Sequence, residues 1–75
     1  MISKEAFLIS LGIHLRQIRE SKNFSQQSLA DTSNLPKTTI GRIERAEISA
    51  TITTLVKIAD ALEIEPMQLL NFQIK

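Results

Sequence analysis

The sequence predicts an all-α fold in which five short helices form one compact bundle. Three observations indicate this. Apolar residues recur at helical spacing in several segments. Only two glycines and two prolines interrupt the chain, which favours helices with short connections. The hydrophobic fraction of 43% is sufficient for a globular core. At 75 residues the chain forms a single domain with a small core, so we assign residues 1–75 to one domain.

The first helix is expected from Lys4 to about Ser21. Four apolar side chains at helical spacing should face the core, namely Leu8, Leu11, Leu15 and Ile18. A second apolar stripe contains Ala6, Ile9 and Ile13. Apolar helix stripes are usually core, so we favour a helix that is buried on two sides. The alternative is that the second stripe contacts a partner subunit.

The second and third helices are expected at about Gln26–Ser33 and about Pro36–Arg45, with a tight turn between them. Ser25 is a good N-cap, because its hydroxyl can accept from a free amide of the first helical turn. Asn34 falls where the first of these helices should end, and asparagine tolerates the left-handed conformation common at that position. Pro36 suits a helix start, where its missing N–H matters least.

The third helix has an apolar and a cationic side. Ile40 and Ile43 are three residues apart and should face inward. The side chains left to face outward are small or basic, namely Lys37, Thr38, Gly41, Arg42 and Arg45. Such a face can enter a DNA groove, so the pair of helices is interpreted as a helix-turn-helix.

Two further helices are expected after a loop at Ala46–Ala50. Residues Thr51–Leu62 contain several β-branched residues, which favour a strand. The helical period of the apolar residues nevertheless predicts a helix, capped by Thr51. Pro66 should open a last helix that ends at about Asn71 and buries Leu69 or Leu70.

The last five residues, Asn71–Lys75, form a short tail that carries Phe72 and Ile74. Two large apolar side chains have no obvious place in so small a core. They either fold back on their own helices or contact a second subunit, because exposed apolar surface often marks an interface. The sequence leaves both alternatives open.

Four blocks of sequence resemble the lambda-repressor-like helix-turn-helix family, also called the XRE or Cro type. They are L-R-Q-I-R at Leu15–Arg19, S-Q-x-x-L-A at Ser25–Ala30, T-I-x-R-I-E-R at Thr39–Arg45 and T-L-V-K-I-A-D-A-L at Thr54–Leu62. The resemblance extends roughly from Leu11 to Leu70. Four blocks in register are far more specific than any one of them.

The resemblance implies binding of double-stranded DNA, with the third helix in the major groove. The first turns of a recognition helix point into that groove. We therefore expect base contacts from Lys37, Thr38, Arg42 and Gln26. Phosphate contacts are expected from Ser25, Gln26, Thr39 and Arg45, the first two because a helix N-terminus offers free amides.

The family also implies a structural role for two charged residues. Arg19 and Glu44 match a pair that ties the first helix to the recognition helix. The loop departs from the family pattern, because Ala46 and Glu47 stand where a glycine and a basic or polar loop are usual. Ala46 argues against a left-handed helix end, and the absence of Lys and Arg from the loop predicts a modest salt dependence of DNA binding.

The charge distribution agrees with a DNA-binding face. From Arg16 to Arg45 there are six basic and three acidic residues, whereas from Ala46 onward there are two basic and four acidic residues. A basic half that carries the motif suits a protein that presents one side to phosphate. The net charge of +1 is not by itself a nucleic-acid signature.

We therefore expect a small transcriptional regulator that binds a two-fold-related operator as a homodimer. The alternative is an antitoxin or another protein-interaction module with a protein partner, in which DNA binding is secondary. An enzyme is not expected, because the chain has no Cys, one His and no phosphate-binding glycine loop. No cofactor or metal site is expected. No apolar run has membrane-spanning length and no signal peptide is evident, which favours a cytoplasmic location.

Overall fold

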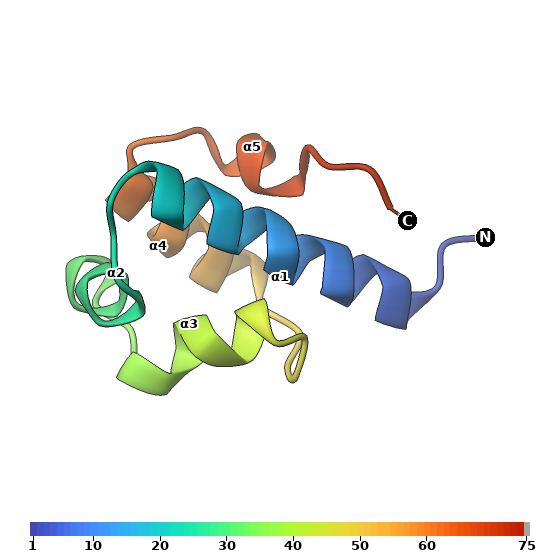
Figure 1. Cartoon of the computed structure of the whole chain (residues 1–75), viewed down its shortest axis with the longest axis horizontal. Coiled ribbons are helices and arrows are strands. Elements are labelled where there is room, and N and C mark those ends of the chain that lie inside the picture. The colour runs from blue at the N-terminus through green and yellow to red at the C-terminus, as the bar shows by residue number, and fades with distance from the viewer. Residues whose placement is uncertain (75) are drawn as a thin grey trace.

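The computed structural model describes residues 1–74 and confirms the all-α fold (Figure 1). Within these residues the chain forms five helices, namely α1 (Lys4–Ser21), α2 (Gln26–Ser33), α3 (Lys37–Glu44), α4 (Ile52–Leu62) and α5 (Pro66–Leu70). Each predicted helix is present, and its ends lie within one residue of those expected. The largest differences are in α3, where Pro36 and Arg45 are caps and not helical residues.

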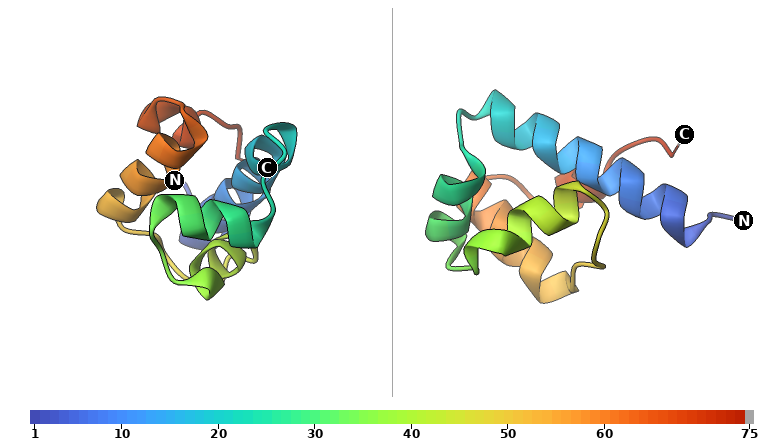
Figure 2. Two further views of the ribbon diagram at one scale, coloured as in Figure 1. Left: turned by 90° about the vertical axis from the view of Figure 1, so that its left-hand side faces the viewer. Right: turned by 60° about the horizontal axis from the view of Figure 1, so that its bottom comes forward.

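The long helix α1 runs along the bundle, with α3 on one side of it and α5 on the other (Figures 1 and 2). Helix α2 packs on α3 and α4 at the end away from both chain termini. One apolar cluster holds these elements together, made of Leu11, Leu15, Leu29, Ala30, Ile40, Ile43, Leu55, Ile58, Ala59, Leu62 and Leu69. Of the two candidates in α5, it is Leu69 that is buried, and Leu70 remains exposed.

Helix α4 forms although its β-branched residues favour a strand. Thr51 caps it, since its hydroxyl oxygen accepts from the Thr54 N–H at 3.1 Å. Leu55, Ile58 and Leu62 are all buried, as the helical period predicts. Burial of one helical face therefore outweighs the local preference, which spans only about 1 kcal/mol per residue.

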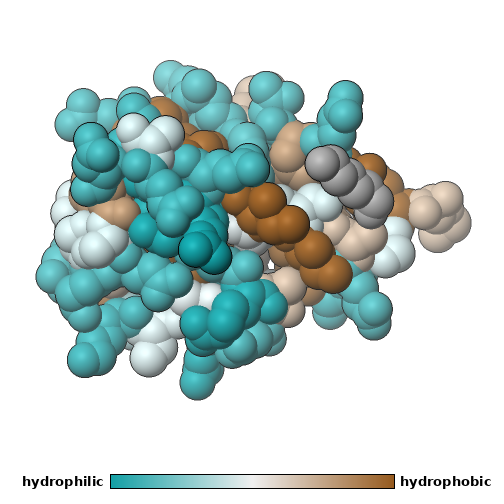
Figure 3. Space-filling view, viewed as in Figure 1, coloured by the Kyte–Doolittle hydropathy of each residue, from teal (hydrophilic) through white to brown (hydrophobic). Residues whose placement is uncertain are grey.

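The second apolar stripe of α1 is not core, so the expectation that α1 is buried on two sides is wrong. Ile9 and Ile13 are each 53% exposed. Helices α3 and α5 both contact α1, and the buried residues of α1 are Leu11, Gly12, Leu15 and Arg19, so the second stripe faces away from the core. Figure 3 shows the result as an apolar streak over the front of α1.

The end of α3 also differs from expectation, because Ala46 does adopt the left-handed conformation, with φ of 59°. The Ala46 N–H donates to the Ile43 carbonyl at 3.0 Å, and the Glu47 N–H donates to the Arg42 carbonyl at 2.8 Å. This is a Schellman motif, which usually has glycine at this position. A residue with a Cβ costs about 1–2 kcal/mol there, and the two hydrogen bonds offset that cost.

The C-terminal tail folds back on its own chain at Phe72. The Phe72 ring lies 5.2 Å from the Phe7 ring and 5.4 Å from the His14 ring, measured between centroids. The His14 Nε2 in turn lies 2.7 Å from the Gln68 carbonyl oxygen. Of the two alternatives for the tail, Phe72 therefore shows the first, in which the tail folds back on its own helices. Lys75, the last residue of that tail, lies outside the described residues.

The absence of a side chain at Gly12 allows α1 and α3 to pack closely. A Cβ at Gly12 would lie 2.5 Å from the Glu44 carbonyl oxygen and 2.7 Å from that of Ile43. These are backbone atoms at the end of α3, so they cannot move without displacing the helix. The crossing of α1 and α3 therefore requires a residue without a side chain.

We predict that Gly12→Ala lowers the free energy of unfolding by about 1–3 kcal/mol, the usual cost of overpacking. It does so although Ala favours a helix over Gly by about 1 kcal/mol. The matched control is Gly41→Ala, where the nearest atom to a Cβ is Arg45 Nη1, at the far end of an exposed side chain and not in the backbone; this variant should be at least as stable as the parent. Urea unfolding followed by circular dichroism measures both, and equal stability of the two variants would contradict the prediction.

Candidate nucleic-acid interface

Local hydrogen bonds fix both ends of α2, including the turn that joins it to α3. The Ser25 hydroxyl oxygen accepts from the Ser28 N–H at 2.9 Å, and the Ser28 hydroxyl oxygen accepts from the Ser25 N–H at 2.9 Å. At the other end of α2, Asn34 is left-handed with φ of 57°. The Leu35 N–H then donates to the Ala30 carbonyl at 2.9 Å, so the chain reverses within a few residues before Pro36 caps α3.

Helix α3 presents one side to the core and the other to solvent. Ile40 and Ile43 are fully buried. The predicted outward side chains Lys37, Thr38, Arg42 and Arg45 are all exposed, whereas Thr39 is half-buried at the edge of the helix. In Figure 2 (right) the outer side of α3 comes forward, free of other helices. The exposed side is cationic. Gly41, which was also expected to face outward, is buried in its middle.

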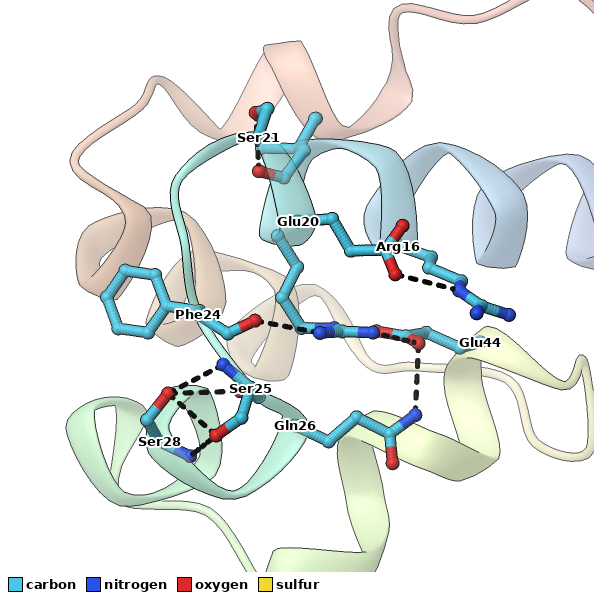
Figure 4. A network of polar contacts seen from close by, with 10 residues as sticks. Arg16, Glu20, Ser21, Phe24, Ser25, Gln26, Ser28 and Glu44 are labelled. Carbon is cyan, nitrogen blue, oxygen red and sulfur yellow. Dashed lines mark hydrogen bonds and ion pairs between the residues drawn. The ribbon is translucent and has the colours of Figure 1, made fainter.

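A buried ion pair anchors α3 to α1. The Arg19 guanidinium donates to the Glu44 carboxylate through Nε at 2.6 Å and Nη2 at 3.1 Å, and through Nη1 to the Phe24 carbonyl at 2.8 Å. The two charged side chains are only 9% and 4% exposed. The hydrogen bond with Glu44 raises the pKa of Arg19 above its ordinary value, and burial opposes that rise. Figure 4 shows the Glu44 carboxylate at the centre of this network.

Gln26 extends the network to the start of α2. Its side-chain amide donates to Glu44 Oε1 at 3.0 Å (Figure 4). Its own Oε1 lies 3.2 Å from the position that a Cβ on Gly41 would occupy. The half-buried Gln26 side chain therefore lies between α2 and the exposed side of α3. The Ser25 hydroxyl is taken up by the cap. This leaves the amides of Gln26 and Gln27, which have no helical partner, for an anion at the α2 N-terminus.

The structure also contains a contact that the sequence analysis missed. The Arg45 Nε donates to Glu47 Oε2 at 2.6 Å, and the two side chains are 58% and 49% exposed. This hydrogen bond raises the pKa of Arg45 and lowers the pKa of Glu47 from their ordinary values. The signal was present as opposite charges two residues apart at a helix end, but only the turn at Ala46 brings them together.

We also searched the described residues for a metal site and for a membrane-spanning helix. Among residues 1–74, no group of three or more His, Cys, Asp or Glu is placed to hold a metal ion. No helix in that part of the chain is long and apolar enough to cross a membrane.

Two short helices joined by a tight turn, with an anchored inner side and a free cationic outer side, define a helix-turn-helix DNA-binding protein. Comparisons with known proteins identify the family. Residues 15–69 match the family model HTH_3, described as helix-turn-helix. The chain therefore belongs to this helix-turn-helix family, and it is a DNA-binding transcriptional regulator. This confirms the resemblance to lambda-repressor-like proteins.

Individual relatives agree with this assignment. The control protein C.SmaI of Serratia marcescens is 40% identical over 63 residues, which cover 84% of this chain and 75% of C.SmaI. The restriction-modification controller protein C.AhdI of Aeromonas hydrophila superposes with a TM-score of 0.81 at 37% identity, covering 83% of this chain and 94% of the C.AhdI chain. SinR, the master regulator for biofilm formation, solved in complex with DNA, has a TM-score of 0.77 at 27% identity, covering 81% and 98% of the two chains.

We predict that Glu44→Ala lowers the free energy of unfolding by about 3–5 kcal/mol, because it leaves the Arg19 charge buried without its partner. The matched control is Arg16→Ala, which breaks the exposed pair with Glu20, where the N–O distance is 3.4 Å. Exposed pairs of this kind contribute about 0.3–0.5 kcal/mol. Thermal and urea unfolding measure both variants, and a loss for Glu44→Ala as small as that of the control would contradict a structural role for the pair.

Proposed function

We propose that the chain binds double-stranded DNA as a homodimer, with the exposed side of α3 in the major groove of each half of a two-fold-related operator. The observation that carries the proposal is the orientation of α3. Its apolar side is buried and its end is tied to α1 by Arg19 and Glu44, so the opposite, cationic side is held outward as one rigid surface. A rigid helix of this kind fits the major groove.

Three exposed residues of α3 are proposed to contact base edges. Arg42 can donate bidentately to one guanine, and Lys37 can donate to guanine acceptors. Thr38 lies one helical turn before Arg42 and can hydrogen-bond or touch a thymine methyl. Gln26 borders the same surface through its Oε1, which supports a fourth base contact.

Phosphate contacts are proposed at the edges of this surface. The free amides at the α2 N-terminus, next to Ser25 and Gln26, suit a phosphate because the helix dipole is positive there. Thr39 is half-buried at the edge of α3 and is proposed to reach the backbone on that side. Arg45 was expected to contact phosphate as well, but its pair with Glu47 competes with that contact.

We predict that Arg42→Ala removes discrimination of about 1–3 kcal/mol at one base pair and has little effect elsewhere in the site. The cognate sequence is first obtained by selection from a random duplex pool, and single-base variants are then measured by fluorescence anisotropy. The matched control is Lys57→Ala, which removes the same charge from an exposed position on α4. Equal weakening on every sequence would show that Arg42 contacts phosphate instead.

A second copy of the chain is proposed to pack on the apolar surface of α4 and α5. Four large side chains are exposed there, namely Ile52, Val56, Met67 and Leu70. Ile52 and Leu70 also line a groove of about 410 Å³ together with Ile2. A domain of this size often needs a partner for stability, and two half-sites supply the specificity that one short recognition helix lacks.

We predict that Val56→Asp raises the dimer dissociation constant at least about tenfold, because it places a charge in an apolar interface. Ile13→Asp, which places the same charge on the exposed stripe of α1, serves as the control. Sedimentation equilibrium measures both. Dissociation by Ile13→Asp alone would place the interface on α1, and a parent chain that is monomeric at every concentration would reject the homodimer.

The regulatory role is proposed from the relatives. Since C.SmaI is a control protein and C.AhdI is a restriction-modification controller, we propose that this chain controls genes of a restriction-modification system. It would act in the cytoplasm, by binding and not by catalysis. The selected DNA sequence tests this directly, because it should occur upstream of restriction or methyltransferase genes in the genome that encodes the chain.

A further inference from the structure

The Arg45 side chain does not extend away from the end of α3. It turns back over Gly41, because its Nη1 lies 2.8 Å from the position that a Cβ of Gly41 would occupy. Gly41 is buried beneath it, and Gln26 Oε1 borders the same position at 3.2 Å. The absence of a side chain at position 41 thus makes room for the Arg45 guanidinium in the middle of the surface that carries Lys37 and Arg42.

Glu47 holds the guanidinium in this place. Its carboxylate accepts from the Arg45 Nε at 2.6 Å. Its own backbone is fixed as well, since the left-handed turn at Ala46 brings the Glu47 N–H to the Arg42 carbonyl at 2.8 Å. The hydrogen bond from Arg45 lowers the pKa of Glu47, and the charges of Arg45 and Arg42 lower it further. Glu47 is therefore anionic at neutral pH.

This arrangement separates the donors of Arg45 into two sets. Nε donates to Glu47, whereas Nη1 lies over Gly41 and has no partner there among the hydrogen bonds of the described residues. A guanidinium bound through Nε can still donate its Nη hydrogens to a base edge. A phosphate, which lies beside the groove and not at its floor, would draw the side chain away from Gly41 and separate it from Glu47.

We propose that Glu47 is a specificity-determining residue: by holding the Arg45 guanidinium over Gly41, it directs Arg45 toward a base edge and keeps it from the phosphate backbone. Binding to DNA of arbitrary sequence depends on phosphate contacts, so Glu47 weakens that binding more than it weakens binding to the cognate site. This inference rests on the proposed function, in which the outer side of α3 faces DNA.

The test measures binding to two labelled duplexes, one of random sequence and one carrying the selected site, between about 50 and 200 mM salt. The proteins are the parent, Glu47→Gln, Arg45→Gln and the double variant. For Glu47→Gln we expect roughly two- to fivefold tighter binding to the random duplex, the range that one exposed pair allows. The slope of log K against log salt should steepen by about 0.9, one additional phosphate contact. The ratio of cognate to random affinity should fall.

The double variant separates positioning from simple repulsion between Glu47 and DNA. If Glu47 acts by holding Arg45, the gain from Glu47→Gln disappears in the Arg45→Gln background. The matched control is Asp60→Asn, which removes one negative charge from an exposed position on α4. A gain that persists without Arg45, or one that Asp60→Asn reproduces, would overturn the inference, as would an unchanged or higher ratio of cognate to random affinity.

The outcome for Arg42 distinguishes failure of this inference from failure of the proposed function. If Arg42→Ala changes base preference but Glu47→Gln has no effect, α3 reads DNA and Glu47 has no part in specificity. If the parent binds neither duplex in a salt-dependent way, both proposals fail together.

Discussion

The contact between the end of α3 and the middle of α1 is the constraint on which the rest of the structure depends. It combines a steric and an electrostatic condition. Gly12 allows the carbonyl groups of Ile43 and Glu44 to approach α1 closely, and Arg19 meets the Glu44 carboxylate a short distance away. Removing two charges from water costs several kcal/mol for each ion. The hydrogen bonds that Arg19 donates to Glu44 and Phe24, and that Gln26 donates to Glu44, offset this cost only when α3 lies in one position.

That position determines what the outer side of α3 can do. Because the inner side is committed to the core and the carboxylate of Glu44 is turned inward, the exposed side carries positive charge without a carboxylate from the same helix. The Gln26 amide connects the N-terminus of α2 to the same ion pair. The two proposed DNA-contact regions, the α2 N-terminus and the α3 surface, are thus connected by one polar network.

In the turn after α3, an unfavourable backbone conformation accompanies a favourable ion pair. Ala46 accepts an unfavourable backbone conformation that glycine would adopt freely, and this turn places Glu47 beside Arg45. A basic loop would have added a phosphate contact at this point. Glu47 instead pairs with the Arg45 guanidinium. The end of α3 therefore has fewer unpaired positive charges than its sequence suggests.

Much of the fold could be predicted from the sequence, because helices depend on local patterns. The apolar period, the caps at Ser25 and Thr51 and the turn at Asn34 and Pro36 place the five helices to within a residue. The exposed side of α3 follows for the same reason, since Ile40 and Ile43 fix which side is buried. Family motifs added Arg19 and Glu44 as a pair, which no local pattern indicates for residues 25 positions apart.

What only the tertiary structure decided are the features that depend on neighbours from other elements. The apolar stripe of α1 is exposed because α3 and α5 occupy the other sides of that helix, and no local pattern distinguishes a second core face from an uncovered one. The left-handed Ala46 and the Arg45–Glu47 pair depend on two hydrogen bonds at the end of α3 that outweigh the residue's own preference. By itself, the sequence determined the helices and the apolar stripes that they carry, because these are set by short-range spacing. How the helices pack, and where each charge lies on the surface, could be seen only in the tertiary structure, because both depend on contacts between residues far apart in the sequence.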